Sequence, residues 1–137
     1  MVYQRLVEIG RVVYIAKGDN EGKIATIVNI IDGNKVLLDG PNSGVSRCVR
    51  NLKDLQLTKL SLKLAVQQRT KGVKTLWEKE GVTASWESST WAKKIAARKT
   101  REAMTDFDRF KLMRAKQCRN RLIKVELAKL KKAARKA

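Results

Sequence analysis

The sequence contains no histidine and only two cysteines, Cys48 and Cys118. Histidine is the usual general base of enzymes and a common zinc ligand, so its absence removes the Ser–His and Cys–His catalytic pairs and nearly all catalytic zinc sites. The cysteines lie far apart in the sequence, outside any CxxC motif, which favours two reduced thiols over a disulfide without excluding one. We expect no enzymatic activity, no cofactor and no bound metal.

Long apolar runs are also missing. No stretch approaches the roughly 18 apolar residues that are needed to cross a bilayer, and the N-terminal residues lack the apolar core of a signal peptide. The sequence therefore predicts a protein of the cytosol or nucleus.

Negative charge is scarce. The 137 residues carry 31 Lys and Arg against 13 Asp and Glu, a formal net charge of +18. Residues 1–68 have 10 basic and 6 acidic side chains, a net of +4, whereas residues 69–137 have 21 and 7, a net of +14. Such a surplus repels itself unless a polyanion lies beside it. A membrane surface is disfavoured because the basic helices have a modest apolar face, so we expect RNA.

Two local patterns resemble catalytic motifs only superficially. Residues 18–23 fail as a phosphate-binding loop, because three residues instead of four separate the glycines and Ile24 replaces the hydroxyl that would bind Mg²⁺. Asp106 and Asp108 form a pair of carboxylates, but Thr105 before them completes a capping pattern that predicts the start of a helix. We expect no small-molecule substrate.

The first half of the chain shows short β-branched runs between turn residues. The strand at residues 24–31 is apolar on both faces, so a second element must cover it. Asp32-Gly33 is expected to supply the positive φ angles of a tight hairpin. Such runs at roughly ten-residue spacing predict a small closed or nearly closed β-barrel, whose small core needs added stability from the second half of the chain or from a partner. The predicted strands are Arg11–Ile15 and residues 24–31, 35–39, 47–50 and 60–64.

From about Thr70 onward, good helix formers replace the β-branched runs. One helix is expected from Trp91 to about Ala103, capped by Ser88, Ser89 or Thr90. A second is expected to begin after Thr105 and to reach about Lys132, a rod roughly 40 Å long that cannot be buried in its own small domain. The predicted fold class is α+β: a β-barrel domain at residues 1–68, followed by a basic α-helical RNA-binding extension at 69–137 that includes one long helix.

Basic side chains of the loops and helices are the predicted RNA contacts, because Lys and Arg bind phosphates without reading the base sequence. A solvated helix is the weaker alternative, since few acids stand near the cations of the second helix. Trp77, Trp86 and Trp91 could stack on bases, although docking on the barrel or on a neighbouring protein is the favoured interpretation. The predicted RNA-binding residues are Lys17, Lys23, Arg47, Arg50, Lys93, Lys94, Arg98, Lys99, Arg101, Arg109, Lys111, Arg114, Lys116, Arg119 and Arg121.

Residues 10–13, Lys17-Gly18, Gly22-Lys23 and Asp32-Gly33 together resemble a KOW motif, the strand–loop–strand unit of SH3-like barrels in ribosomal proteins and transcription elongation factors. Gly22 stands at the position of the hallmark glycine, where the backbone turns sharply and leaves room for RNA. This resemblance alone leaves open a KOW-type factor that binds RNA polymerase or maturing RNA transiently.

Four further segments resemble the eukaryotic large-subunit (60S) ribosomal proteins of the family numbered fourteen: residues 5–13, 36–41, 91–96 and 105–110. The resemblance implies an SH3-like barrel and a long C-terminal helix, seated on large-subunit ribosomal RNA beside other large-subunit ribosomal proteins. It implies a structural role in the cytoplasmic ribosome, with nucleolar or nuclear transit during subunit assembly. It implies neither catalytic residues nor a cofactor.

Overall fold

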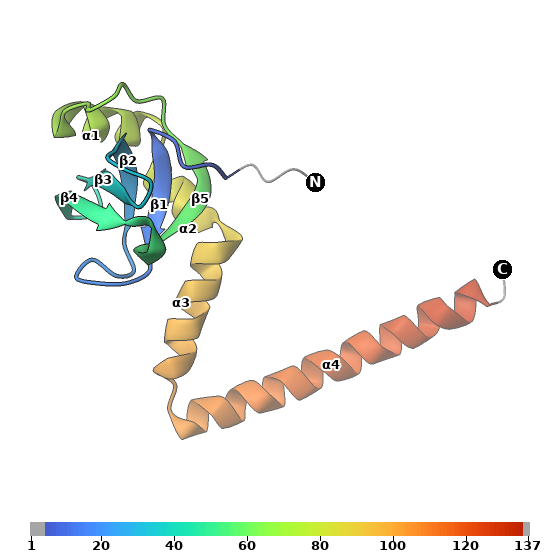
Figure 1. The fold of residues 1–137 in the computed structure, drawn as a ribbon. Coiled ribbons are helices and arrows are strands. Elements are labelled where there is room, and N and C mark those ends of the chain that lie inside the picture. The colour runs from blue at the N-terminus through green and yellow to red at the C-terminus, as the bar shows by residue number, and fades with distance from the viewer. Residues whose placement is uncertain (1–4, 136–137) are drawn as a thin grey trace. The chain divides into compact units, whose positions relative to one another are not determined.

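A computed structural model describes residues 5–135 of the chain (Figure 1). Within these residues the fold is α+β as predicted, an antiparallel sheet followed by helices. The described residues divide into two compact units between Ala92 and Lys93. The elements are β1 (Arg11–Ile15), β2 (Ile24–Ile30), β3 (Lys35–Gly40), β4 (Val45–Asn51), the 3-10 turn η1 (Leu52–Asp54), β5 (Leu55–Ser61), α1 (Thr70–Lys79), α2 (Val82–Ser88), α3 (Thr90–Glu102) and α4 (Asp106–Ala134).

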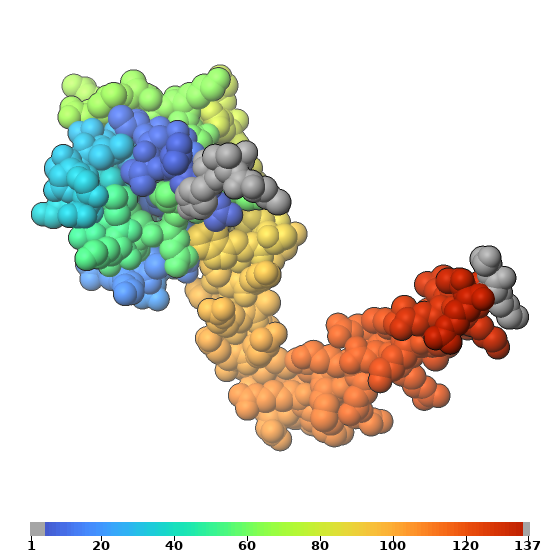
Figure 2. All heavy atoms as spheres, turned by 45° about the vertical axis from the view of Figure 1, so that its right-hand side comes forward, coloured from blue at the N-terminus to red at the C-terminus, as the bar shows by residue number. Residues whose placement is uncertain are grey.

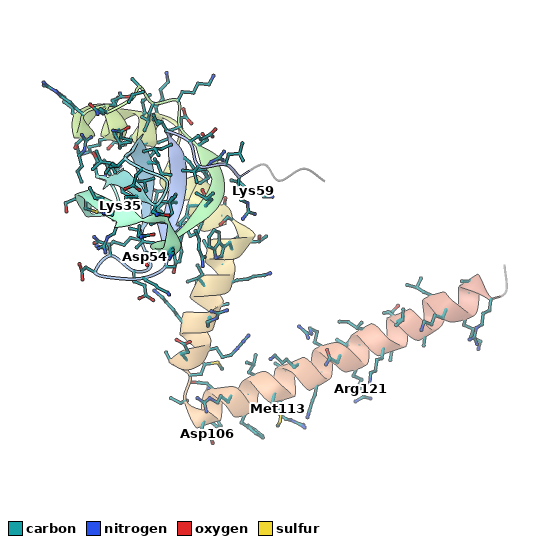
Figure 3. All side chains as sticks on the ribbon, viewed as in Figure 1. Lys35, Asp54, Lys59, Asp106, Met113 and Arg121 are labelled. Carbon is teal, nitrogen blue, oxygen red and sulfur yellow. The ribbon has the colours of Figure 1, made fainter. Side chains whose placement is uncertain are left out.

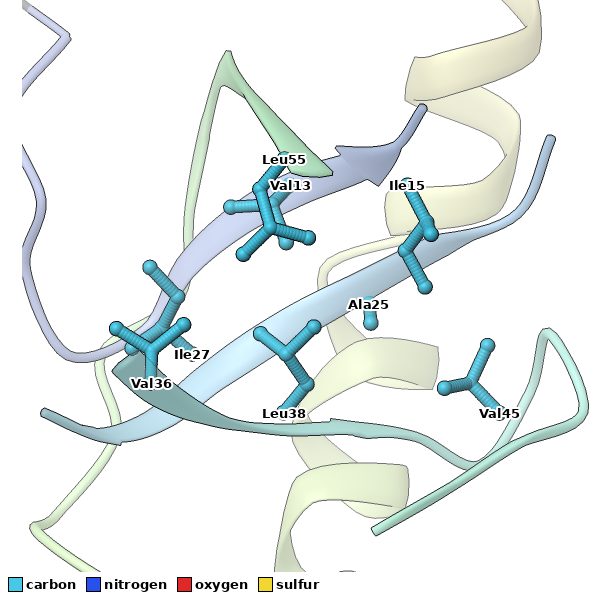
Figure 4. Close-up of a cluster of buried hydrophobic side chains, with 8 residues drawn as sticks. All are labelled: Val13, Ile15, Ala25, Ile27, Val36, Leu38, Val45 and Leu55. Carbon is cyan, nitrogen blue, oxygen red and sulfur yellow. The ribbon is translucent and has the colours of Figure 1, made fainter. Parts of the chain in front are cut away.

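The strands form one sheet in the order β4-β3-β2-β1-β5, which is barrel-like without closing. Every neighbouring pair is antiparallel, and Val13 of β1 stands between Ala25 of β2 and Leu57 of β5. One face of this curved sheet encloses the first hydrophobic core (Figure 4). Its buried members are Val13, Ile15, Ala25, Ile27, Val36, Leu38, Val45 and Leu55.

The opposite face of the sheet carries a second core, which the helices complete. Val12, Ile24 and Leu62 pack there against Trp77 of α1 and Val82 of α2. The Trp77 side chain is 1% exposed. The sequence predicted that a further element would cover β2, which is apolar on both faces. This prediction is confirmed, and helices α1 and α2 provide the cover. Sequence analysis did not place these two helices.

Two predictions about the strands are wrong in detail. Gly33 does not adopt a positive φ; instead the Asp32 carboxylate accepts the backbone N–H groups of Asn34 and Lys35 at 2.7 and 2.6 Å. A side chain thus closes the β2–β3 turn, which removes the need for a left-handed backbone. The last strand is β5, not residues 60–64: the leucine alternation there arises because Leu62 is buried under the helices, beyond the end of the strand.

Glycines allow two sharp changes of chain direction. Gly22 has a φ of +87°, and its N–H donates to the Ile15 carbonyl at 2.9 Å. The sharp turn expected at the hallmark glycine is therefore confirmed. Gly10, with a φ of +89°, lies so close to the backbone just after β5 that an added Cβ would stand 1.8 Å from the Leu62 carbonyl oxygen.

The two long helices begin where the sequence predicts. The Ser89 hydroxyl accepts the Ala92 N–H at 3.2 Å and so is the side chain that caps α3. The Thr105 hydroxyl accepts the Asp108 N–H at the start of α4. α4 runs for 29 residues and has no buried residue, and Figure 2 shows its side chains standing out along the helix in orange and red. Among the described residues, no helix combines the length and apolar character that a membrane span requires.

Candidate nucleic-acid interface

The β1–β2 loop gathers three of the predicted cations at one end of the sheet. Lys17 is exposed in this loop. Lys23 Nζ donates to Asn20 Oδ1 and to the Gly44 carbonyl, both at 3.3 Å, and so links the loop to the β3–β4 turn. Arg50 of β4 reaches the same loop, where its Nη2 lies 3.4 Å from Asp19 Oδ2. Lys17, Lys23 and Arg50 thus belong to one loop cluster.

Arg47 serves a different purpose from the other predicted cations. Its Nε and Nη2 donate to Asp39 Oδ2 at 3.1 and 2.9 Å, and Nη2 also donates to the Gln68 carbonyl. The Asp39 side chain is 1% exposed and accepts a further bond from the Thr70 hydroxyl. Arg47 therefore neutralises a buried carboxylate and joins the sheet to the start of α1. Sequence analysis missed Asp39 and Thr70, although a lone acid within an apolar strand was a usable signal.

The remaining predicted cations lie on α3 and α4, and all of them are exposed. Those of α3 are Lys93, Lys94, Arg98, Lys99 and Arg101. Those of α4 are Arg109, Lys111, Arg114, Lys116, Arg119 and Arg121, the last of which projects from the helix in Figure 3. Several are held by neutral partners on their own helix: Arg114 bonds to Gln117 and Arg119 to Asn120. Their positive charge therefore stays available.

Lys111 is the α4 cation with a local acidic partner in the predicted set. Its Nζ donates to Asp108 Oδ1 at 2.9 Å and lies 4.4 Å from the centre of the Phe107 ring. The hydrogen bond from Lys111, followed by that from Thr105, holds the pKa of Asp108 below its ordinary value. Asp108 thus stays ionised at the positive end of the helix dipole. Its role is structural, as the capping pattern predicted.

The corner between α3 and α4 brings cations of the two helices together. A cavity of about 650 Å³ there is lined by Arg101 of α3 and by Arg109 and Lys116 of α4, with the acid Glu102 beside them and Met104 and Leu112 among its apolar walls. Guanidinium and ammonium groups outnumber the carboxylate around this hollow, an arrangement that can hold an anion such as a phosphate group. No residue spacing in the sequence identified this convergence, because it depends on the turn at residues 103–105.

The tryptophans all take part in packing on the sheet side. Trp77 docks in the second core, and its indole N–H donates to Thr83 Oγ1 at 2.9 Å. Trp86 and Trp91 are half-buried and meet the Tyr14 ring of β1, with ring centres 5.7 and 5.4 Å away. The favoured interpretation, docking on the barrel, is thus confirmed for Trp77, while the other two also keep exposed surface.

Fold and site together define a class of protein: a small basic barrel that carries a long, unburied cationic helix, built to associate with something larger. The family model described as "Ribosomal protein L14" matches residues 46–120. The chain is 50% identical over 136 residues to "Large ribosomal subunit protein eL14" of Lumbricus rubellus, covering 99% of this chain and 90% of that protein. Proteins of the same name from Schizosaccharomyces pombe and Drosophila melanogaster are 41% and 38% identical, over 96% of this chain and over 98% and 80% of their own lengths.

This chain belongs to the ribosomal protein L14 family. The resemblance that the sequence segments carried is therefore confirmed. Members of this family are structural components of the ribosome, so the expectation of a non-enzymatic protein is confirmed by family membership.

Proposed function

We propose that this chain binds ribosomal RNA in the large subunit through its loop cluster and its cationic helices, and that it braces neighbouring ribosomal proteins. One observation carries the proposal: α4 extends for 29 residues without burying any of them. A helix of this length gains most of its stability from packing, which α4 does not find within the described part of its own unit. We infer that its partner is another molecule.

The charge of α3 and α4 selects RNA as that partner. Their predicted cations are exposed and have few acids beside them, so the repulsion between them falls when phosphates replace loosely held counterions. Contacts of this kind fix position and orientation and do not read sequence, which suits a structural component. Lys17, Lys23 and Arg50 provide a second set of phosphate contacts at the loop cluster. Arg47 contributes by holding the barrel together.

Apolar side chains on α4 supply the reason to expect protein neighbours as well. Leu122, Ile123, Val125, Leu127 and Leu130 are between 47% and 68% exposed. Phosphates cannot bury these apolar side chains, whereas an apolar patch on an adjacent protein would remove them from water. We place the protein in the cytoplasmic ribosome, with transit through the nucleolus and nucleus during assembly.

The functional division follows from the same reasoning. Residues 1–68 provide the sheet, and residues 69–137 provide the RNA-binding extension. α1 and α2 lie at the start of this extension and complete the second core. They anchor it to the sheet, while α3 and α4 carry the exposed charge.

Sedimentation tests the proposal directly. In a sucrose gradient of cell extract at moderate salt, the protein should travel with large subunits at one copy per subunit and leave them only at high salt. A variant with Arg109, Arg114, Arg119 and Arg121 changed to Gln should leave at lower salt. A variant with Lys35, Lys53, Lys63 and Lys79 changed to Gln serves as its control, because these exposed lysines of the sheet unit lie outside the proposed contacts. Substoichiometric, growth-dependent association would instead favour a KOW-type factor that binds RNA polymerase or maturing RNA transiently.

A further inference from the structure

We propose that the aromatic cluster of Tyr14, Trp86 and Trp91 binds an unpaired RNA base. The inference rests on the proposed function, because it assumes that the protein meets RNA. It adds a different kind of contact at a different place, since phosphate binding by α3 and α4 requires no aromatic ring.

The cluster is a preformed platform. Tyr14 and Trp86 are stacked, with ring centres 5.7 Å apart and 25° between their planes. Trp91 meets Trp86 edge-on at 5.1 Å and 72°, and Tyr14 at 5.4 Å. Because three elements supply the rings (β1, α2 and α3), each ring holds the other two in place. A ligand that stacks here would lose little free energy to ordering the protein side chains.

Two cavities open beside this platform. The smaller, of about 320 Å³, is lined by Trp86 and Trp91 together with Lys59, Arg5 and several hydroxyl-bearing side chains. The larger, of about 490 Å³, shares Arg5 and Trp91 with it and continues along β5. These volumes are within the range of small-ligand sites, about 300 to 1,000 Å³. No acidic residue is among the described residues that line either cavity.

The chemistry of these walls matches a nucleotide. Aromatic rings stack on any base, and the cations Arg5 and Lys59 can meet the phosphates that flank a splayed base. Among residues 5–135, the indole N–H groups of Trp86 and Trp91 donate no hydrogen bond, whereas that of Trp77 donates to Thr83. A base presents carbonyl oxygens and ring nitrogens that can accept such bonds.

An apolar side chain of a neighbouring protein is the competing occupant. It would fill the cavity beside the rings, but it would leave two cations and the indole donors without partners. The charge and the hydrogen-bonding groups therefore favour RNA.

The test compares two probes on the full-length chain: a short unstructured oligouridine and an RNA duplex of equal length, with affinity measured by fluorescence anisotropy. Trp91→Leu should weaken binding of the oligouridine by about tenfold, the typical effect of removing one stacking ring, and leave binding of the duplex within about twofold. Trp91→Phe should restore most of the loss. The double variant Arg5→Gln, Lys59→Gln should also weaken binding of the oligouridine more than binding of the duplex. Lys35→Gln is the control, since Lys35 is exposed on β3, away from the cavities (Figure 3).

Each outcome is decisive. If Trp91→Leu does not fold, the Arg5→Gln and Lys59→Gln pair, which leaves the core intact, decides the question. If the α4 arginine variant loses affinity for both RNAs while the Trp91 and Arg5/Lys59 variants bind like the parent chain, the proposed function stands and the base site is refuted. If the parent chain binds neither RNA, both proposals fall.

Discussion

The Thr70 hydroxyl donates a hydrogen bond of 2.7 Å to the buried carboxylate of Asp39. This bond joins the start of α1 to β3, and Arg47 bonds to the same carboxylate oxygen at 2.9 Å. α1 in turn presses Trp77 onto the sheet. The sheet and α1 should therefore unfold together, although the change in sequence composition near residue 69 assigns them to different domains.

Replacing Asp39 by Ala should lower the free energy of unfolding of the full chain by about 2 to 3 kcal/mol, since Arg47 and Thr70 lose their shared acceptor. The measurement is urea denaturation followed by the fluorescence of Trp77, Trp86 and Trp91, all of which pack on the sheet. Asp19→Ala is a matched control, because the Asp19 side chain is 97% exposed and its pairing with Arg50 should contribute little. Equal midpoints for the two variants would contradict the linkage between sheet and α1.

Gly10→Ala should destabilise the chain by about 3 kcal/mol or more, since the new Cβ would collide with the Leu62 backbone in addition to straining a positive φ. Gly81→Ala separates these two effects. Gly81 also has a positive φ, +57°, but nothing lies within 4 Å of its Cβ position, so only the strain of about 1 to 2 kcal/mol remains. Thermal melts of the two variants provide the comparison, and similar losses would show that Gly10 does not lie against the Leu62 backbone.

Asp108 should make the start of α4 sensitive to acid. Its pKa is lowered, first by Lys111 and then by Thr105, so its contribution to helix stability is complete above the ordinary aspartate pKa. That contribution is lost as the pH falls through the lowered value. Carboxyl chemical shifts followed by NMR should show Asp108 titrating below 3.8, its ordinary value. Asp108→Asn should weaken the pH dependence of helicity in the first turn. Titration of Asp108 at its ordinary value would contradict its bonds to Lys111 and Thr105.

Thr105→Val tests the same helix start by a different route. Removing the hydroxyl leaves the Asp108 N–H without its acceptor, so the first turn of α4 should fray at a cost of about 1 kcal/mol. Thr100→Val is the control, since the Thr100 hydroxyl bonds to a carbonyl inside α3 instead of capping a terminus. Amide hydrogen exchange at residues 106–109 is the readout, and protection equal to that of the parent chain would contradict the prediction.

Local sequence patterns predicted most of the secondary structure. Strand β1 was predicted at its exact bounds because β-branched residues alternate between turns, and α4 because Thr105 and the following acids mark a start with no breaker behind it. α1 escaped detection because Arg69, the residue before its first turn, provides no side-chain cap, and α2 because it has only 7 residues. Both helices are fixed by tertiary contacts, chiefly those of Trp77 and Val82 with the sheet, which a local pattern does not encode.

The candidate site was predictable in its charge but not in its arrangement. Composition identifies a cationic surface, since no folding could remove so many lysines and arginines from solvent. The partner of each cation depends on the fold: Arg47 meets Asp39 only because β3 and β4 pair, and Trp91 meets Tyr14 only because α3 starts beside β1. Strand pairing makes the first contact and the packing of a helix on the sheet makes the second, and neither follows from a local sequence pattern.

The salt dependence of binding to purified large-subunit ribosomal RNA tests the central claim, that phosphates hold the cationic helices. If α3 and α4 neutralise about six phosphates, the slope of log affinity against log salt should be about −4 to −5. Changing Arg109, Arg114 and Arg119 to Gln should make this slope less negative by about 2 to 3, at about one contact per arginine. Changing Lys35, Lys53 and Lys63 of the sheet unit to Gln should leave the slope unchanged. A slope that the arginine changes leave unaltered would contradict the account.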